Sequence, residues 1–286
     1  MEIGVAFPQA EIGNDPSAIR DFAQAAESLG YSHLFVADHV LGAHPDREPP
    51  LSGPYTHETS FHEPFVLLAY LAGRTRQIGL VTGVLVLPQR QTALVAKQAA
   101  ELDLLSGGRL RLGVGTGWNY VEYAALNQEF RTRGKRQEEQ VQLLRQLWEH
   151  PVVDFTGRWH RIDRAGIQPR PGRRIPIWFG GGADRVLERA ARIGDGIIPP
   201  SSGPNAASRE LLERLSKHLA AHGRDRSSFG FEAQVTLEGG PREWVRRATE
   251  WREVRADYLC LRTTNSGLTT PQQHIEALEC FRSEVG

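Results

Sequence analysis

Two adjacent residues, Asp38 and His39, are the first in this sequence with the chemistry of a catalytic site. A histidine titrates near neutral pH and can donate or accept a proton, and a carboxylate can orient a ligand through a hydrogen bond. In the alternative interpretation, Asp38 caps the next segment and His39 lies at the surface. Neighbouring residues of a strand point in opposite directions, so the two side chains need not touch.

The pair follows a short apolar run, residues 33–37, which is rich in β-forming residues and is preceded by Gly30. This pattern predicts a buried strand. In barrels and open sheets of parallel strands, ligands bind at the carboxyl ends of the strands. We therefore expect Asp38 and His39 at the mouth of a site that other strand ends complete.

A glycine-rich turn at 180–182 lies between a predicted strand, 176–179, and a predicted helix, 183–193. Such a turn leaves backbone N–H groups free at a helix amino terminus, where the helix dipole favours a phosphate. Asp184 opposes an anion if it faces inward. The alternative is a tight turn without a ligand, since the segment matches neither the dinucleotide fingerprint nor a Walker loop.

Two further strand ends carry glycines. The segment 116–119, Thr-Gly-Trp-Asn, follows a predicted strand at 110–114, where glycine permits close approach of a ligand and Trp118 offers a flat surface for stacking. Gly83 interrupts an apolar run at the end of the predicted strand 78–82, which indicates a bulge or an unusual backbone. Each signal is weak when taken alone.

Short apolar runs alternate with longer amphipathic stretches, a pattern that predicts parallel strands joined by crossover helices. Eight such units in 286 residues favour a closed (β/α)8 TIM barrel, formed by a single domain over residues 1–286. A doubly wound open sheet is the alternative. The predicted strands are 3–7, 33–37, 78–82, 110–114, 176–179, 195–198, 229–236 and 257–261. The predicted helices are 16–29, 63–73, 90–105, 132–149, 183–193, 205–222, 241–254 and 271–284.

Two segments interrupt the alternation. Residues 41–62 form a long polar loop after the second strand, and long loops in compact domains are usually functional. Residues 152–171 read as a hairpin-like insertion between the helix at 132–149 and the strand at 176–179. The histidines and acidic residues in and around the loop lack the tight spacing of metal ligands, so we expect no metal site.

Composition excludes some classes of partner. Basic and acidic residues both number 34, so the formal net charge is zero, which argues against nucleic acid or an anionic membrane. No run approaches the roughly 18 apolar residues of a membrane helix. We expect Cys260 and Cys280 to be reduced and at least partly buried. No secretory signal is visible, so we expect a cytoplasmic protein.

Several motifs, in this order, resemble the bacterial luciferase-like monooxygenase superfamily, and within it the coenzyme F420-dependent oxidoreductases. They cover most of residues 1–200, and they are specific for the superfamily rather than for a substrate. The motifs are IGVAFPQ at 3–9, LGYSHLFVADHV at 29–40, RQIGLVTGVLVLPQR at 76–90, the segment 94–127, RGKRQEEQVQLLRQLW at 133–148 and IPIWFGGGADRVLERAARIGDGIIP at 175–199.

The resemblance implies a luciferase-like barrel that holds F420 or FMN at its carboxyl end. It implies a non-proline cis peptide behind the flavin ring, at Gly83–Val84, and catalytic roles for His39 and Asp38. The implied cofactor-binding residues are Asp38, Thr82, Gly83, Val84, Thr116, Gly117, Gly180, Gly181, Gly182 and Asp184. The substrate pocket would include Trp118, Asn119 and His44. Sugar-phosphate dehydrogenases of the group carry a glutamate where this chain has Trp118 and Asn119, which argues against their substrate.

We therefore expect an oxidoreductase that transfers a hydride between F420 and a small organic substrate, with 41–62 as a lid. Two alternatives remain open: an FMN-dependent monooxygenase that receives reduced flavin from a partner reductase, and a non-catalytic flavin-binding protein. The resemblance also implies a homodimer. A metal-dependent barrel hydrolase is disfavoured, because the first predicted strand has no ligand histidines.

Overall fold

The computed structural model describes residues 1–200 and 203–286, and its main strands form one closed ring. All neighbours in the ring pair in parallel, and β3 closes it by pairing with both β2 and β5. The predicted (β/α)8 barrel is thereby confirmed, and the open-sheet alternative is wrong. The ring runs through β1 (Glu2–Ala6), β2 (His33–Val36), β3 (Gly79–Thr82), β5 (Leu110–Gly115), β8 (Ile177–Gly180), β9 (Gly196–Ile198), β10 (Gly230–Thr236) and β11 (Tyr258–Arg262).

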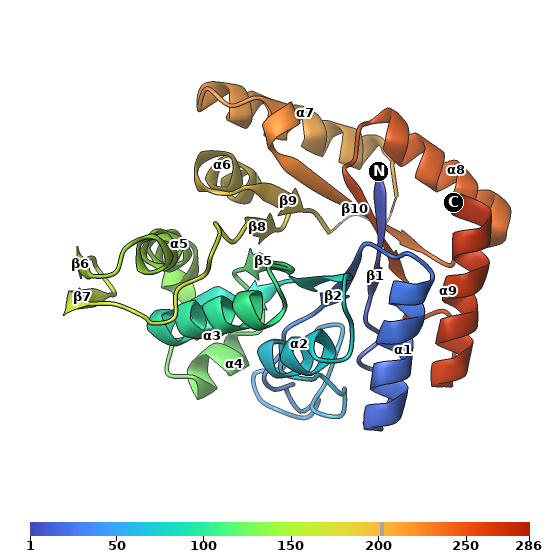
Figure 1. Ribbon diagram of the computed structural model, residues 1–286, viewed down its shortest axis with the longest axis horizontal. Coiled ribbons are helices and arrows are strands. Elements are labelled where there is room, and N and C mark those ends of the chain that lie inside the picture. Colours follow the sequence, from blue (N-terminus) through green and yellow to red (C-terminus); the bar gives the residue numbers. More distant parts are fainter. Residues whose placement is uncertain (201–202) are drawn as a thin grey trace.

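Helices surround the strands, as Figure 1 shows. Side chains cap the starts of two of them: Asp15 accepts the backbone N–H of Ser17 ahead of Pro16, and Thr270 forms a capping box with Gln273. The outer helices are α1 (Pro16–Ser28), α2 (Pro64–Ala72), α3 (Thr92–Leu105), α5 (Arg133–Glu149), α6 (Asp184–Ile193), α7 (Ala206–Ala221), α8 (Gly240–Glu253) and α9 (Pro271–Val285).

The apolar core has two parts. The larger part lies between the barrel and the helices, where Phe22, Leu68 and Phe281 are fully buried. The smaller part includes Phe35 and Trp178 and contains Cys260. Burial of large apolar side chains on both sides of the strands explains why the strand sequences read as continuous hydrophobic runs rather than alternating ones.

Several short strands and helices lie outside the barrel strands and the outer helices. The insertion at 152–171 contains the predicted hairpin, which projects beyond α5 (Figure 1). A short helix at the carboxyl end of β5, α4, was not predicted. The additional elements are β4 (Leu85–Val86), η1 (Leu87–Gln89), α4 (Tyr120–Ala125), η2 (Phe130–Thr132), β6 (Val153–Thr156), β7 (Arg161–Ala165) and η3 (Arg226–Ser228).

Two expectations from composition can be compared with the described residues. Among them, no helix has both the length and the apolarity that crossing a bilayer requires. Cys260 and Cys280 are both free thiols, as predicted. Cys260 is buried, but Cys280 is exposed, so the expectation that both are at least partly buried is wrong for Cys280. Its position on the outer helix α9 accounts for the difference.

Candidate active site

Asp38 lies just beyond the end of β2 and is only 2% exposed. Its carboxylate accepts the backbone N–H of Val86 at 2.8 Å and two N–H groups of Arg90, from Nη2 at 2.7 Å and Nε at 3.2 Å. Glu63 binds the same guanidinium at 2.7 Å. Burial opposes the charge on Arg90, but Asp38 and Glu63 outweigh it and raise the pKa of the guanidinium.

The contacts of Asp38 give it a positioning role. They tie the segment that follows β3 to the end of β2, and this segment contains two of the expected cofactor-binding residues, Gly83 and Val84. The expected contact of Asp38 with a ligand ring stays a prediction. Arg90, which sequence reasoning did not select, is the partner that compensates its buried charge.

His39 lies in an aromatic cluster at the mouth of the barrel. Its ring centroid is 3.8 Å from that of Tyr55, 4.9 Å from Phe61 and 6.4 Å from Trp118. Its Nδ1 shares a hydrogen bond with the hydroxyl of Tyr55 and lies 3.4 Å from Oε1 of Glu122. The side chain remains 17% exposed, so the ring is fixed yet accessible.

Glu122 is 1% exposed and sits in the first turn of α4. Its Oε1 also accepts the backbone N–H groups of Val40 and Leu41, at 2.8 and 3.1 Å. Asn119 begins the helix by accepting the N–H groups of Val121 and Glu122. Sequence reasoning missed Glu122, although an asparagine followed three residues later by a glutamate is a helix-start signal.

Asn119, expected in the substrate pocket, joins the elements around His39, and its place in the pocket stays a prediction. It is 1% exposed, and its Nδ2 donates to the hydroxyl of Tyr55 at 3.2 Å and to the carbonyl of Leu41 at 3.1 Å. Burial raises the pKa of the Tyr55 hydroxyl, and the hydrogen bond from Asn119 opposes this rise. Tyr55 is therefore a neutral phenol at physiological pH.

The 41–62 loop folds over this end of the barrel. It supplies Tyr55 and Phe61 to the cluster, and Gly53 packs so closely on the indole of Trp118 that a Cβ at Gly53 would lie 1.8 Å from the ring. Only glycine fits at this contact. The loop therefore forms part of the surroundings of His39, and its role as a lid stays a prediction.

His44, in the same loop, lies apart from the cluster. Its ring stacks on His57 with centroids 4.5 Å apart, and its side chain is 56% exposed. Among the described residues, it forms no hydrogen bond, ion pair or ring contact with His39. Its expected place in the substrate pocket stays a prediction.

The end of β3 has the backbone that the resemblance implies. The peptide bond between Gly83 and Val84 is cis. Val84 packs against the glycine turn, since a Cβ at Gly180 would lie 2.7 Å from its Cγ1. Thr82 is fully buried and its hydroxyl donates to the carbonyl of Gly113 at 2.7 Å, so this side chain is used by the scaffold.

The glycine turn connects β8 to α6 as predicted. Gly181 has a φ of +131°, which L residues rarely adopt, and its N–H donates to the carbonyl of Ile198 at 3.0 Å. Ala183 precedes α6 and provides no side-chain hydrogen bond to its first turn. The carboxylate of Asp184 faces α7, where it binds Nε2 of His218 at 3.0 Å, so it does not oppose an anion at the turn.

A cavity of about 820 Å³ adjoins the glycine turn. Ala183 and Val186 of the α6 region line it, and Thr116 lines it from the end of β5. Gly117, next to Thr116, has a φ of +62° and packs on Val86. The turn excludes a Cβ, the helix amino terminus has no side-chain cap, and the cavity is large, so these residues fit a phosphate-bearing cofactor.

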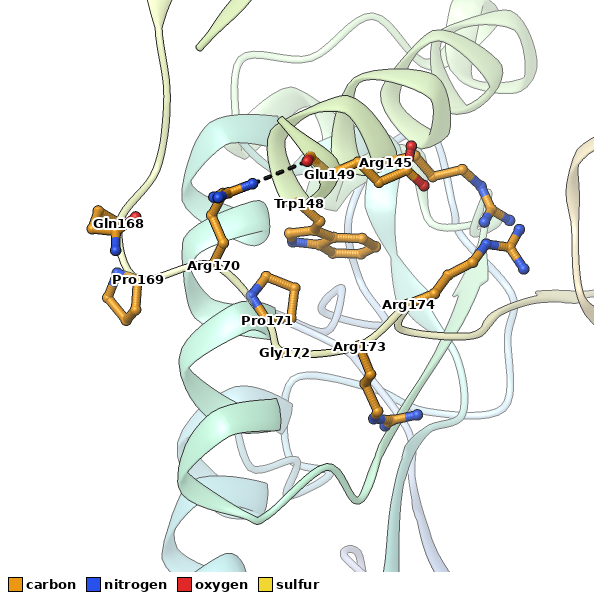
Figure 2. A pocket seen from close by; sticks show the side chains of 10 residues that line it. All are labelled: Arg145, Trp148, Glu149, Gln168, Pro169, Arg170, Pro171, Gly172, Arg173 and Arg174. Carbon is orange, nitrogen blue, oxygen red and sulfur yellow. Dashed lines mark hydrogen bonds between the residues drawn. The ribbon is translucent and has the colours of Figure 1, made fainter. Parts of the chain in front are cut away.

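A second cavity, of about 400 Å³, lies at the opposite end of the barrel, where the segment 168–174 leads into β8 (Figure 2). Trp148 of α5 lines it, and Arg145 and Arg174 lie side by side. Both arginines bind Asp195, at 3.1 and 2.7 Å, so their charges are paired. Barrel active sites form at the carboxyl ends of the strands, so we assign this cavity to the scaffold.

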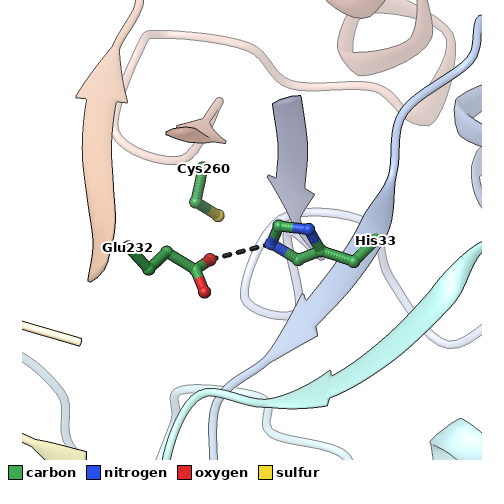
Figure 3. A group of neighbouring side chains, drawn as sticks. All are labelled: His33, Glu232 and Cys260. Carbon is green, nitrogen blue, oxygen red and sulfur yellow. Dashed lines mark hydrogen bonds and ion pairs between the residues drawn. The ribbon is translucent and has the colours of Figure 1, made fainter. Parts of the chain in front are cut away.

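His33, Glu232 and Cys260 form a buried cluster inside the barrel (Figure 3), with ligand atoms within 4.8 Å of one another. Arg111 also binds Glu232, at 2.5 Å. Burial lowers the pKa of His33 and raises that of the Cys260 thiol. Although burial opposes its charge, Arg111 and His33 hold the pKa of Glu232 below its usual range. The guanidinium already compensates the carboxylate, so the cluster is an ion-pair network rather than a metal site.

Known proteins resemble this chain along its whole length. A model of the family described as luciferase-like monooxygenase matches residues 1–279. An uncharacterized protein of Mycobacterium tuberculosis is 35% identical over 98% of both chains. The F420-dependent glucose-6-phosphate dehydrogenase of Kineococcus radiotolerans is 30% identical over 82% of this chain and 68% of its own.

Solved structures share the fold. One of them, an F420-dependent secondary alcohol dehydrogenase in complex with an F420–acetone adduct, superposes with a TM-score of 0.80 at 17% identity. The match covers 99% of this chain and 97% of that one. At this level of identity, the likeness shows the barrel architecture.

Proposed function

The chain belongs to the luciferase-like monooxygenase family of oxidoreductases, and we propose that it transfers a hydride between coenzyme F420 and a small organic substrate. The F420-dependent dehydrogenase among its relatives supports this cofactor. When bound, the deazaflavin supplies the hydride chemistry, and the protein supplies orientation, exclusion of water and proton transfer. The glycine turn at 180–182 and the first turn of α6 would hold its phosphate.

The arrangement of His39 is the observation that carries the proposal. Its Nδ1 faces Tyr55 and Glu122, whereas Nε2 has no hydrogen-bond partner among the described residues. In the tautomer with the proton on Nδ1, the ring donates to the hydroxyl oxygen of Tyr55, and Nε2 presents a lone pair. A histidine fixed through one nitrogen and accessible at the other is suited to general acid–base catalysis.

A second candidate function is oxygen-dependent chemistry with reduced FMN from a partner reductase. The observation that favours it is the enclosure of the site: Tyr55, Phe61 and Trp118 surround His39 beneath the 41–62 loop. Exclusion of water protects reactive flavin species. Substrate loss that requires both reduced FMN and oxygen would favour this function, and turnover unaffected by removal of oxygen would exclude it.

We also propose a homodimer. Large apolar side chains are exposed on two neighbouring helices, Val66 on α2 and Leu94 and Leu105 on α3, at 69%, 51% and 76%. Exposed large apolar side chains gathered on neighbouring helices support a subunit contact there. Light scattering of the purified chain gives the mass in solution directly, and a monomer would contradict the proposal. The cytoplasmic location stays a prediction.

The first experiment is a pair of titrations of the purified chain with F420 and with FMN, followed by tryptophan fluorescence. We expect F420 to bind more tightly. With a substrate identified, His39→Gln should lower kcat by about 10²–10⁴-fold without lowering the affinity for the cofactor. His150→Gln, at an exposed position after α5, is the control and should retain full activity. Full turnover by His39→Gln would overturn the proposal.

A further inference from the structure

The cavity beside the glycine turn has a strongly basic lining. The chain as a whole has a formal net charge of zero. The lining nevertheless contains six basic side chains, Arg131, Arg133, Lys135, Arg158, Arg185 and Arg189, and two acidic ones, Glu138 and Glu188. Such a local excess of one sign in a concave surface attracts a ligand of the opposite charge.

The two acidic side chains do not cancel this excess, because other groups already occupy them. Glu138 binds Nε of Arg189 at 2.9 Å and Nη2 of Arg192 at 2.8 Å. Glu188 binds Arg192 at 3.1 Å and lies 3.4 Å from His222. Arg192 and His222 are not lining residues, so the carboxylates are largely used outside the cavity.

The remaining cations have no acidic partner among the described residues. Arg131, Lys135, Arg158 and Arg185 are all exposed. The guanidinium of Arg158 lies over the ring of Trp159, 5.1 Å from its centroid, and forms no ion pair. Arg133 likewise has no acidic partner among the described residues, so five cationic groups line the cavity without neutralisation.

These cations come from three regions of the chain: α6, the adjoining η2 and α5, and the β6–β7 hairpin. Arg185 is in the first turn of α6, next to the glycine turn. Lys135 is in the first turn of α5, with Arg131 just before it in η2, and Arg158 lies in the turn of the β6–β7 hairpin. A phosphate at the glycine turn would pair with α6 alone. The cations on α5 and the hairpin are left to bind further negative charge on the same ligand.

We call the cations on α5, η2 and the hairpin, Arg131, Lys135 and Arg158, the basic wall of the cavity. We propose that this basic wall binds a flexible, carboxylate-rich tail that extends from the phosphate of the cofactor. The inference rests on the proposed function and deepens it. FMN ends at its phosphate, whereas F420 continues beyond it into a lactyl chain of glutamates with several free carboxylates. The wall thus makes the chain selective for the tailed deazaflavin, and the β6–β7 hairpin becomes part of the cofactor site.

The test compares three deazaflavins by fluorescence titration of the full-length chain: the riboside without phosphate, the phosphorylated form without glutamates, and the oligoglutamylated form. We expect the wild-type chain to bind the oligoglutamylated form about tenfold more tightly than the glutamate-free phosphorylated form. This gain should shrink as salt concentration rises, because exposed charges are screened.

Charge reversal at the wall locates the effect. The variant Lys135→Glu/Arg158→Glu should remove the gain and leave the affinity for the glutamate-free phosphorylated form unchanged. The matched control, Arg76→Glu/Arg242→Glu, reverses two exposed arginines that do not line the cavity, and it should keep the gain. Circular dichroism checks that both variants are folded.

The possible failures are distinguishable. If the wild-type chain binds both phosphorylated forms equally, the tail site is overturned and the F420 assignment stands. Equal weakening of both forms in the Lys135→Glu/Arg158→Glu variant would also overturn it, because the charges would then act on the phosphate. If no deazaflavin binds and FMN does, the F420 assignment itself is wrong.

Discussion

Oε1 of Glu122 lies 3.4 Å from Nδ1 of His39, and the same oxygen accepts the backbone N–H of the residue that follows the histidine. One buried carboxylate therefore lies beside the ring and hydrogen-bonds the backbone that follows it. The geometry corresponds to an acid–base histidine oriented by an acidic partner.

Replacement of this carboxylate tests its positioning role. Glu122→Gln keeps the shape and one acceptor but removes the charge, so we expect kcat to fall by about 10- to 100-fold, as on loss of a group that orients a functional histidine. The solvent deuterium isotope effect on kcat should rise, because proton transfer becomes limiting. Glu101→Gln, on the exposed face of α3, is the control. Unchanged kcat and isotope effect would contradict the role.

Arg90 compensates the buried charge of Asp38, so its removal should destabilise the fold. Burial raises the pKa of Asp38, and Arg90 is the main opposing influence. Arg90→Met leaves the carboxyl without this partner and should cost about 3–5 kcal/mol in urea unfolding. Asp38→Asn/Arg90→Met should recover part of the loss. Arg76→Met, at an exposed site, should stay within about 0.5 kcal/mol of wild type.

The close packing of Gly180 on Val84 predicts a specific loss of cofactor binding. A methyl group at Gly180 would lie 2.7 Å from Cγ1 of Val84, so either the turn or Val84 must move. Overpacking of this kind costs about 1–3 kcal/mol, and we expect Gly180→Ala to weaken cofactor binding by about tenfold or more. Gly172→Ala places its methyl in open space and should bind normally. Equal affinities of the two variants for the cofactor would refute the role of the glycine turn in cofactor binding.

The ion-pair network in the barrel predicts acid sensitivity. His33 has a lowered pKa because it is buried, so the unfolded chain takes up a proton near the ordinary pKa of 6.5 that the folded chain does not. This stabilisation is complete above pH 6.5 and is lost as the pH falls. His33→Gln should therefore reduce the slope of unfolding free energy against pH between about pH 7 and pH 5.

In His33→Gln, the slope of the unfolding free energy against pH will be reduced but will not reach zero. Burial also lowers the pKa of His160 and of His274, which contribute with the same sign. His150→Gln, at an exposed position, should leave the slope as in wild type. Identical slopes for wild type and His33→Gln would show that the network does not control acid unfolding.

Sequence alone predicted the barrel because each strand is buried on both faces and each crossover helix has a start or stop signal. The run at 33–37 and the turn at 180–182 illustrate this, since local composition suffices to read both. Gly83 within an apolar run indicated an unusual backbone, but the cis peptide at Gly83–Val84 was implied only by the family resemblance.

The partners of the site residues were harder to find. Tyr55 lies 16 residues from His39 along the chain, Glu122 lies 82 residues from Val40, and Arg90 lies 52 residues from Asp38. Such pairings depend on how loops pack at one end of the barrel, and no local period encodes them. Only Glu122 had a local signal, as the third residue after a helix-starting asparagine.

The origin of Tyr55 in the 41–62 loop constrains how this protein can diverge. The loop covers the entrance and, through Tyr55, also holds the nitrogen that fixes His39. A loop rebuilt to admit a bulkier molecule would release the histidine at the same time. Substrate specificity and the orientation of His39 therefore depend on the same loop in this chain. A designed change of specificity must keep Tyr55 in place.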